Sequence, residues 1–438
     1  MIIPNIKNRF LKAKEKDFNL QTKETDCYPF ATSPSFLTIM PKKFLIIGAG
    51  FSGAVMARQL VEKLDCHVEV WDERDHLGGN CHTERDSQTG VMVHRYGPHI
   101  FNTNSDEVWA YVKRFGEFHP YVNRVKAVTS RGVFSMPINL LTINQLFGKA
   151  MGPEEARSFV SSLGDQSIVE PSNFEEQALK MMGRELYETF FRGYTIKQWG
   201  CDPRELPASV LKRLPIRFNY DDNYYDKKHQ GIPVAGYTEV IGNILDHPGI
   251  AVIRGKRFFP SELVQIKKAY THLFYTGPID AFFDYSEGRL GYRTVNFERI
   301  STEVNDYQGT AVINYPDQSV PWTRIHEHKH FTPWEEHEGT AVFREFSKET
   351  ETLDVPYYPK RLKRDRMMLN VYRSMAEGWS DVSRLNSEVC GVSFLGRLAT
   401  YRYMDMETVI AEAIKFSEKI VLESVAGDPI PIFPNKEE

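Results

Sequence analysis

The sequence predicts an α/β protein with a Rossmann-like dinucleotide-binding domain, an inserted helical domain and an antiparallel β-sheet domain. A strand, a glycine turn, a helix and a second strand follow one another from residue 41. Between about residues 138 and 212 the apolar residues have helical spacing, and from about 289 to 346 short β-rich runs replace them. Alternation of strand with helix is typical of a parallel sheet, whereas consecutive short strands favour an antiparallel one.

The composition is that of an ordinary globular protein. The chain has 438 residues, a formal charge of −4, 41% apolar and 26% charged residues. A balance this close to neutral, without a basic tail, argues against nucleic acid as a partner. No apolar run reaches the roughly 18 residues of a membrane span, and five scattered cysteines without a C-x-x-C pair indicate reduced thiols in a cytoplasmic protein.

Residues 1–40 form a polar, lysine-containing leader with three prolines and no helical periodicity, so we expect this leader to be poorly ordered. The first domain begins after it. Residues 44–47 read as a strand, Gly48, Gly50 and Gly53 as a turn that opens a helix, and residues 68–71 as the next strand, which ends at Asp72. This is the context that a dinucleotide fingerprint requires, with Ser52 in the turn and the acid placed for ribose hydroxyls.

The residues after the second strand favour FAD over NAD as the dinucleotide. Glu73 and Arg74 precede a pair of glycines, the second of which is Gly79, and Asn80 follows the pair. This arrangement resembles the second signature of glutathione-reductase-like flavoproteins. Far downstream, a strand ends at the Gly396–Arg397 pair and a long helix begins near residue 405. The N-terminus of that helix would face the flavin, with four residues of the segment 403–408 as contacts besides Tyr403: Met404, Asp405, Met406 and Thr408.

The chain is expected to enter the FAD-binding domain three times. We assign residues 41–114, 237–285 and 344–438 to that domain and 138–212 to the helical domain, with a mobile loop at about 204–217. The antiparallel sheet domain takes residues 115–137, 213–236 and 286–343.

Several motifs together closely resemble the bacterial UDP-galactopyranose mutase family over residues 41–425. They are YGPHIF (96–101), FFRGYTIKQW (190–199), RLPIR (213–217), DDNYY (221–225), QGIP (230–233), EHKHF (327–331) and GR with YRY (396–403). The resemblance implies an isomerase that interconverts UDP-galactopyranose and UDP-galactofuranose without net redox change. It implies FAD that is active when reduced, with NAD(P)H as external reductant, N5 of the flavin as nucleophile towards the anomeric carbon, and a homodimer.

The same resemblance implies roles for individual residues. Arg213 and Arg324 match the two diphosphate-binding arginines, and they would also stabilise departing UDP. His99, Ile100 and Val252 would contact the flavin, with His99 close to the chemistry. The uridine and sugar pocket would be formed by Asn123, Phe190, Tyr194, Thr195, Trp199, Tyr224, Arg289, Asn314, Glu345, Tyr358 and Tyr403. Without the resemblance, an aromatic stripe at helical spacing is more often core than pocket.

Three local features stand apart from the resemblance. Asn102 stands where the family usually has a histidine, which affects hydrogen bonding on the flavin side. His326, His328 and His330 alternate along a predicted strand and could face one way like metal ligands, but no carboxylate or cysteine completes a set in the sequence, so no metal is expected. Cys81 and Cys201 show no neighbouring base and read as packing residues.

Other interpretations stay open at this point. An amine-oxidase-like flavoprotein shares the glycine fingerprint and the second signature, but would not need two phosphate-binding arginines. A non-catalytic binding protein can also keep this scaffold. Within the mutases, UDP-N-acetylgalactosamine, UDP-arabinopyranose and dTDP-fucopyranose are alternative substrates, because sugar specificity depends on a few pocket atoms.

Overall fold

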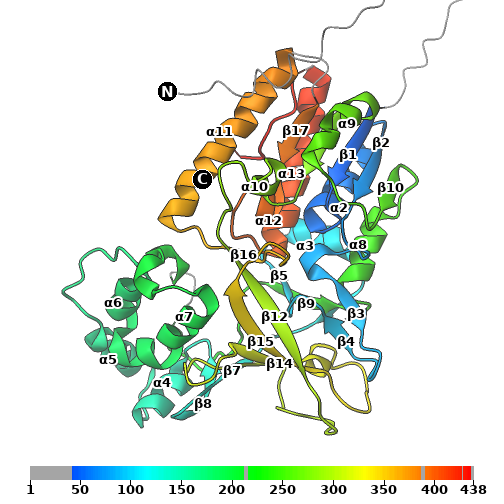
Figure 1. Ribbon diagram of the computed structural model, residues 1–438. Coiled ribbons are helices and arrows are strands. Elements are labelled where there is room, and N and C mark those ends of the chain that lie inside the picture. The colour runs from blue at the N-terminus through cyan, green and yellow to red at the C-terminus, as the bar shows by residue number, and fades with distance from the viewer. Residues whose placement is uncertain (1–41, 212–215, 386–389, 427, 436–438) are drawn as a thin grey trace, which may run out of the picture. The chain divides into compact units, whose positions relative to one another are not determined.

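A five-stranded parallel sheet forms the part of the structure in which the sequence predicts a dinucleotide-binding domain (Figure 1). The structure is a computed structural model that describes residues 42–211, 216–385, 390–426 and 428–435, so the expected leader lies outside the described residues. The strands stand in the order β10 (Ile250–Ile253), β2 (Cys66–Trp71), β1 (Lys42–Ile47), β11 (His272–Tyr275) and β17 (Gly391–Phe394). The chain therefore adds three more strands to this sheet after its first βαβ unit, two from residues 250–275 and one from residues 391–394.

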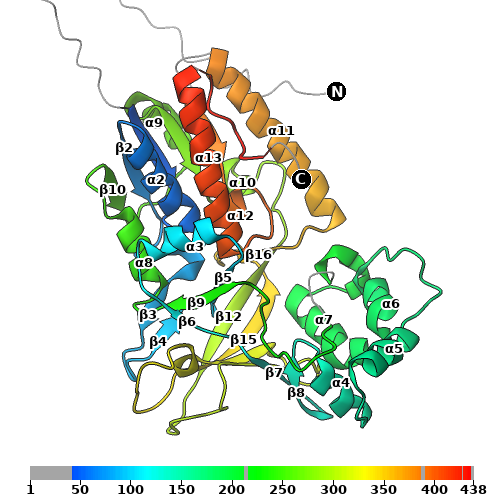
Figure 2. The same cartoon turned by 180° about the vertical axis from the view of Figure 1, so that it is seen from behind.

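Both faces of the parallel sheet are covered by helices, because alternate side chains of the strands are apolar on both sides. Phe44 and Ile46 of β1 pack on one face, and Leu45 packs on the other. The first face is covered by α2 (Phe51–Lys63), α3 (Asp106–Lys113), α8 (Tyr237–Leu245) and α13 (Met406–Ala426). The second face is covered by α9 (Leu263–Ala269), α10 (Ile279–Phe282), α11 (Lys363–Leu385) and α12 (Gly396–Ala399), and Figure 2 shows the arrangement from behind.

A seven-stranded sheet confirms the predicted change to antiparallel pairing. Its order is β16 (Tyr358–Pro359), β12 (Tyr292–Ile300), β15 (Val342–Glu349), β14 (Arg324–Glu327), β13 (Val312–Asn314), β7 (Val125–Thr129) and β8 (Gly132–Met136). All neighbouring pairs are antiparallel except β13 with β7. Two small sheets join it: β3 (Thr83–Arg85) with β4 (Met92–His94), and β5 (Phe101–Thr103), β9 (His229–Pro233) and β6 (Phe118–Pro120).

Helices occupy the segment in which helical spacing predicts them. They are α4 (Leu140–Phe147), α5 (Pro153–Leu163), α6 (Phe174–Tyr187) and α7 (Gly193–Trp199), with a π-helical turn at Glu188–Arg192. The Nζ of Lys197 donates to the carbonyls of Tyr315, Asp317, Val320 and Trp322. Helix α7 is thereby fastened to the loop between β13 and β14. The domain boundaries and the mobility of residues 204–217 stay predictions.

One local prediction is wrong. The three alternating histidines do not share a strand, because β14 ends at Glu327 and residues His328–Phe331 form a 3₁₀ turn. The Glu327 carboxylate is fully buried and accepts the backbone N–H groups of Tyr307 and Gln308 at 2.8 Å each. Only His326 of the three lies on the strand. No helix in the described part of the chain is long and apolar enough to cross a membrane.

Candidate active site

A cavity of about 1130 Å³ begins at the carboxyl ends of three parallel strands and extends to the seven-stranded sheet. Ile47, Trp71 and Tyr275, the last residues of β1, β2 and β11, line its first part, and Asn314 and Arg324 line its far part. The edge at which parallel strands end is where open α/β sheets bind ligands. The volume slightly exceeds the roughly 300–1,000 Å³ of a pocket for one drug-sized ligand, and its lining reaches both large sheets.

Glycines allow the backbone of the first turn to close tightly at the start of α2. A Cβ on Gly53 would lie 1.9 Å from the carbonyl oxygen of Gly48, so no larger residue fits there. Gly50 precedes α2 and gives it no side-chain cap, which leaves the first N–H groups of the helix available to an anion. A Cβ on Gly79 would lie 3.4 Å from the Cα of Gly50, so the two glycine segments are in contact across the cavity floor.

The acid at the end of β2 braces this turn. One carboxylate oxygen of Asp72 accepts the N–H of Ala49 at 2.7 Å, and the other accepts the N–H of Arg74 at 2.9 Å. The side chain is buried, whereas the neighbouring Glu73 is exposed at the rim of the cavity. Both acids border the space expected for a ribose, and Asp72 also fixes the shape of the glycine turn.

Arg74 provides a test of whether these residues suit a dinucleotide. Its Nη2 donates to Asn80 at 2.9 Å, and its guanidinium lies 4.6 Å from the centroid of the Tyr96 ring. Its Nη1 is buried at the cavity without a hydrogen-bond partner in the described part of the chain. A buried cationic donor beside a glycine turn and a helix N-terminus fits a pyrophosphate, so the donor set suits a dinucleotide such as FAD.

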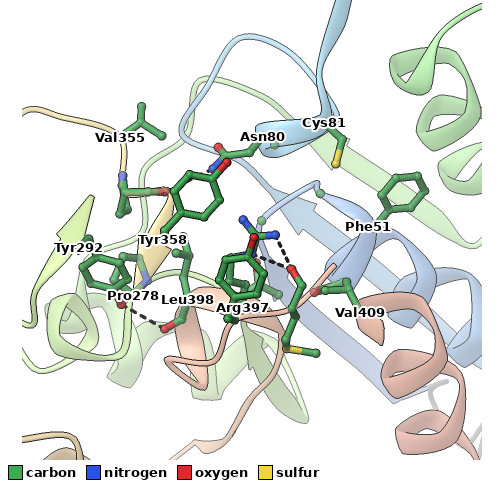
Figure 3. Close-up of a pocket in the computed structure, with 18 of the residues that line it drawn as sticks. Phe51, Asn80, Cys81, Pro278, Tyr292, Val355, Tyr358, Arg397, Leu398 and Val409 are labelled. Carbon is green, nitrogen blue, oxygen red and sulfur yellow. Dashed lines mark hydrogen bonds between the residues drawn. The ribbon is translucent and has the colours of Figure 1, made fainter. Parts of the chain in front are cut away.

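The C-terminal part of the chain supplies another wall, which Figure 3 shows in close-up. The Arg397 Nε donates to the carbonyl of Met404 at 2.9 Å. Its guanidinium lies 5.6 Å from the ring centroid of Tyr358 and 5.5 Å from that of Tyr403, two rings that are stacked at 5.8 Å. Asp405 caps α13 by accepting the N–H of Thr408 at 2.9 Å, so the N-terminus of this helix borders the cavity.

The far end of the cavity is built around a charged pair on adjacent strands. The Arg324 Nε donates to the hydroxyl of Tyr194 at 2.7 Å, and its Nη1 lies 3.5 Å from the Glu345 carboxylate. Glu345 is 3% exposed and also accepts the hydroxyl of Thr323 at 2.9 Å. Burial would raise the pKa of Glu345, but Arg324, His326 and Thr323 outweigh burial and lower it to about 2. The pair is therefore ionised at neutral pH.

His99 also lines the cavity. Its Nδ1 is 2.7 Å from the Gly97 carbonyl, which makes Nδ1 the protonated nitrogen of the neutral ring. Burial, and then the positive charge of Arg397, lower the pKa of His99 to about 4. The backbone N–H of His99 donates to the Nδ1 of His94 at 3.0 Å, which ties this segment to β4. A neutral imidazole with an acceptor nitrogen is thus the form present at neutral pH.

The cavity gathers most of the residues expected from the sequence. Its lining includes these expected residues: Gly48, Gly50, Ser52, Asp72, Glu73, Arg74, Gly79, Asn80, His99, Ile100, Asn123, Tyr224, Arg289, Asn314, Arg324, Arg397, Tyr358, Tyr403, Met404, Asp405 and Met406. Tyr194 and Glu345 do not line the cavity themselves but contact Arg324, which does. Arg213, the second expected diphosphate arginine, lies outside the described residues.

Some expected residues do not line the cavity. They are Gly53, Val252, Gly396, Thr408, Phe190, Thr195 and Trp199. Gly396 still serves the site, because its φ is +84° and a Cβ would lie 2.3 Å from the Ser52 hydroxyl. Phe190 is 3% exposed and packs edge-on against Phe134 in the helical core, as apolar stripes commonly do. Val252 lies on the edge strand β10.

The structure adds residues to the cavity that the sequence does not place there, including Cys81, for which the sequence predicts a packing role. Phe51, Cys81, Tyr292 and His326 all line it. Burial raises the pKa of the Cys81 thiol to about 12, so it is not a nucleophile at neutral pH. His326 appears in the sequence only as one of three alternating histidines, and alternation does not reveal which of them reaches a cavity.

Carboxylates also approach His330, contrary to the sequence-based expectation. The Nε2 of His330 lies 3.2 Å from Asp306 and 3.4 Å from Glu327, and ligand atoms of the three residues lie within 4.8 Å of one another. Hydrogen bonds to Glu327 and Asp306 raise the pKa of His330 against burial. The contacts of His330 with the two carboxylates thus join the loop around residue 306 to the end of β14.

Comparisons with known proteins agree with this geometry. Residues 189–403 match a family model described as UDP-galactopyranose mutase, and residues 46–115 match one described as an NAD(P)-binding Rossmann-like domain. The chain is 52% identical over 392 residues to the "Probable UDP-galactopyranose mutase" of Klebsiella pneumoniae, which covers 90% of this chain and 98% of that protein. It is 49% identical over 378 residues to the dTDP-fucopyranose mutase of Escherichia coli, covering 86% and 97%.

Among solved structures, a crystal structure of reduced UDP-galactopyranose mutase superposes with a TM-score of 0.66 at 15% identity. The match covers 90% of this chain and 99% of that one. At this identity the likeness shows the fold alone. It confirms the predicted combination of a Rossmann-like domain, a helical segment and an antiparallel sheet.

Proposed function

Because the chain belongs to the UDP-galactopyranose mutase family, we propose that it interconverts UDP-galactopyranose and UDP-galactofuranose. Family membership makes the protein a pyranose–furanose mutase of nucleotide sugars with a Rossmann domain suited to FAD. The choice of galactose and uridine is our proposal. It is supported by the 52% identity to the Klebsiella pneumoniae protein over nearly the whole of both chains.

The single observation that carries this function is the position of Arg324. Its guanidinium lines the same cavity as the glycine turn of the Rossmann domain, yet it stands on a different sheet. Tyr194 and Glu345 hold its Nε and Nη1, and Nη2 makes no hydrogen bond within the described part of the chain. A guanidinium presented in this way suits a diphosphate, with each charge-assisted bond worth about 1.5–3 kcal/mol.

The protein groups divide the work between the two ends of the cavity. The glycine turn, Arg74 and Arg397 would hold FAD, which when bound and reduced supplies the nucleophile that the reaction needs. Arg324 would anchor the diphosphate and stabilise its added negative charge when the bond to the sugar breaks. The sugar would then lie between the two ends, with its anomeric carbon held towards the cofactor.

Tyrosine hydroxyls at this end stay protonated. Burial raises the pKa of Tyr224 above its usual value and that of Tyr358 to about 12, so both cavity-lining phenols are hydrogen-bond donors at neutral pH. Donors suit phosphate oxygens, which accept only. Asn123 and Asn314 carry buried side-chain oxygens without a partner in the described part of the chain, and these oxygens suit hydroxyl or ring N–H groups of a substrate.

A second candidate is the conversion of dTDP-fucopyranose, favoured by the 49% identity to the Escherichia coli enzyme. Fucose lacks the 6-hydroxyl of galactose, and dTDP differs from UDP by the thymine methyl and the missing ribose 2′-hydroxyl. The deciding experiment incubates the FAD-loaded protein with dithionite and either UDP-galactofuranose or dTDP-fucofuranose, with chromatography of the pyranose products. We expect UDP-galactopyranose from the first and little conversion of the second, and no product without reductant.

The opposite preference would replace our substrate with the second candidate. A protein that converts neither sugar although it binds and reduces FAD would contradict the proposed function itself.

A further inference from the structure

One ring nitrogen of His326 has a hydrogen-bond partner and the other has none among the described residues. Its Nε2 lies 2.7 Å from a carboxylate oxygen of Glu345, and its Nδ1 is buried without a partner in the described part of the chain. The side chain is 1% exposed and lines the cavity. A buried polar atom without a hydrogen bond is unfavourable, so an unpartnered nitrogen on a residue that lines a ligand cavity points to a ligand that completes it.

The chemistry of Nδ1 follows from its surroundings. Glu345 is a carboxylate at neutral pH and accepts only, so the Nε2 of His326 must carry the proton in this contact. Burial, and the charge of Arg324, lower the pKa of His326 although Glu345 opposes them. The ring is therefore neutral, and Nδ1 presents a lone pair. Such a nitrogen accepts a hydrogen bond from O–H or N–H and is repelled by a phosphate oxygen.

The position of His326 selects the part of the substrate that it meets. On β14 it lies two residues beyond Arg324, on the same face of the strand. The ring centroid of His328 lies 6.3 Å from that of His326, and the ring centroid of His94 lies 5.8 Å from that of His328. The Nδ1 of His94 in turn accepts the backbone N–H of His99. His326 thus stands between the arginine that would bind the diphosphate and the wall that would face the cofactor.

We propose that the Nδ1 of His326 accepts a hydrogen bond from a hydroxyl group of the substrate's sugar, with Glu345 fixing the ring for this contact. The inference rests on the proposed function, because it places the sugar between diphosphate and cofactor. It makes His326 a substrate-binding and specificity-determining residue. A site that offers a buried acceptor to a hydroxyl rejects analogues without that hydroxyl, because their binding would leave the acceptor unpaired.

The test exploits the geometry of glutamine. In His326→Gln the side-chain amide reaches the place of Nε2 and can still donate to Glu345, while the acceptor at the place of Nδ1 is lost. His337→Gln is the matched control, since His337 also contacts a carboxylate, Glu335, through Nε2 at 2.9 Å but does not line the cavity. Isothermal titration of the FAD-loaded, oxidised proteins measures the Kd for UDP and for UDP-galactopyranose.

We expect His326→Gln to raise the Kd for UDP-galactopyranose about 10-fold and to leave the Kd for UDP unchanged. A change of about 10-fold corresponds to one hydrogen bond of about 1.4 kcal/mol. His337→Gln should leave both constants unchanged. Steady-state rates supply a second readout, in which kcat/KM falls at least 10-fold in His326→Gln only.

Three outcomes would overturn the inference. An unchanged ratio of the two Kd values together with unchanged kcat/KM would show that Nδ1 meets no sugar hydroxyl. An equal loss for UDP and UDP-galactopyranose would place the contact on the nucleotide or diphosphate instead. Wild-type protein that binds neither UDP nor dTDP would remove the proposed function as well, whereas the first two outcomes leave that function intact.

Discussion

Replacing Glu345 by glutamine removes the buried negative charge that holds Arg324 and His326, and we expect this change to destabilise the protein strongly. The Glu345 pKa is lowered from 4.5 to about 2. At about 1.4 kcal/mol per pH unit, this difference corresponds to about 3 kcal/mol of folding free energy at neutral pH. The side chain is 3% exposed, so solvent screens little of this contribution.

The sign of the pH dependence follows from the lowered pKa. A carboxyl group with a depressed pKa in the folded state contributes its full stability above about pH 4.5, where the unfolded chain is also ionised. The contribution is lost as the pH falls through about 2, where the folded state takes up the proton. The difference between wild type and Glu345→Gln should therefore be about 3 kcal/mol at pH 7 and roughly half of that at pH 3.

Urea unfolding followed by tryptophan fluorescence measures this difference at both pH values. The control is Glu335→Gln, because Glu335 also receives an arginine and a histidine: Arg85 at 2.6 Å and His337 at 2.9 Å. The Arg85 side chain is 47% exposed, so this surface network should contribute no more than about 1 kcal/mol. The reasoning is refuted if Glu345→Gln is no more destabilising than Glu335→Gln at pH 7, or if its effect is the same at pH 3.

Three further substitutions test the ends of the cavity. Arg324→Ala should raise the Kd for UDP about 10- to 100-fold in calorimetry and leave the flavin absorbance unchanged. The control is Arg344→Ala, because Arg344 lies on the neighbouring strand but does not line the cavity, and this variant should bind UDP like the wild type. Equal Kd values in the two variants would contradict the diphosphate assignment. Gly396→Ala should lower both the flavin content and the melting temperature. The added Cβ would collide with the Ser52 side chain, and a φ of +84° is unfavourable for alanine. A variant with wild-type values of both would show that the collision is relieved. Asp72→Asn should weaken FAD binding measurably in a dialysis experiment, since its amide cannot accept the N–H groups of both Ala49 and Arg74; retention equal to wild type would mean that the turn keeps its shape without the carboxylate.

The nucleotide-binding half of the fold was predictable because its signals are local. Three glycines within six residues, an apolar strand before them and an acid after the next strand define the turn without reference to distant residues. What remained hidden was the direction in which Asp72 points. Its bond to the Ala49 backbone arises only when β1 and β2 pair in register, with Ile47 opposite Trp71. Sequence spacing alone suggests a ribose ligand and does not show the brace.

The far end of the cavity depends on contacts that are distant in sequence. Arg324 faces Glu345 because β14 and β15 pair antiparallel with these two residues opposite each other. Nothing in the sequence fixes that register. The period-2 pattern also wrongly predicted that the strand continues through His328. The strand ends at Glu327, whose buried carboxylate bonds to the backbone of the loop at residues 307–308. A strand's length is decided by such tertiary contacts, which period-2 patterns do not contain.

Family resemblance assigned the stripe of residues 190–199 to the substrate pocket, while helical spacing favoured the core. The structure divides the stripe: Phe190 packs in the helical core, and Tyr194 reaches Arg324. Lys197, which the pattern did not single out, is bonded to four carbonyls of the loop before β14. Positions three or four residues apart on this helical segment thus have packing, pocket and fastening roles, and only the location of the neighbouring loop tells them apart.

Arg324 and His326 share one carboxylate, and this sharing couples the two ends of the proposed substrate. Glu345 lies within 3.5 Å of the Arg324 Nη1 and 2.7 Å of the His326 Nε2. If a diphosphate binds Arg324, it competes with Glu345 for the guanidinium, and Glu345 then bonds more fully to the imidazole. That shift strengthens the Nε2 bond and makes Nδ1 a better acceptor for a hydroxyl. Diphosphate and sugar should therefore bind cooperatively, and losses from Arg324→Ala and His326→Gln should deviate from additivity by about 0.5–3 kcal/mol in UDP-galactopyranose binding.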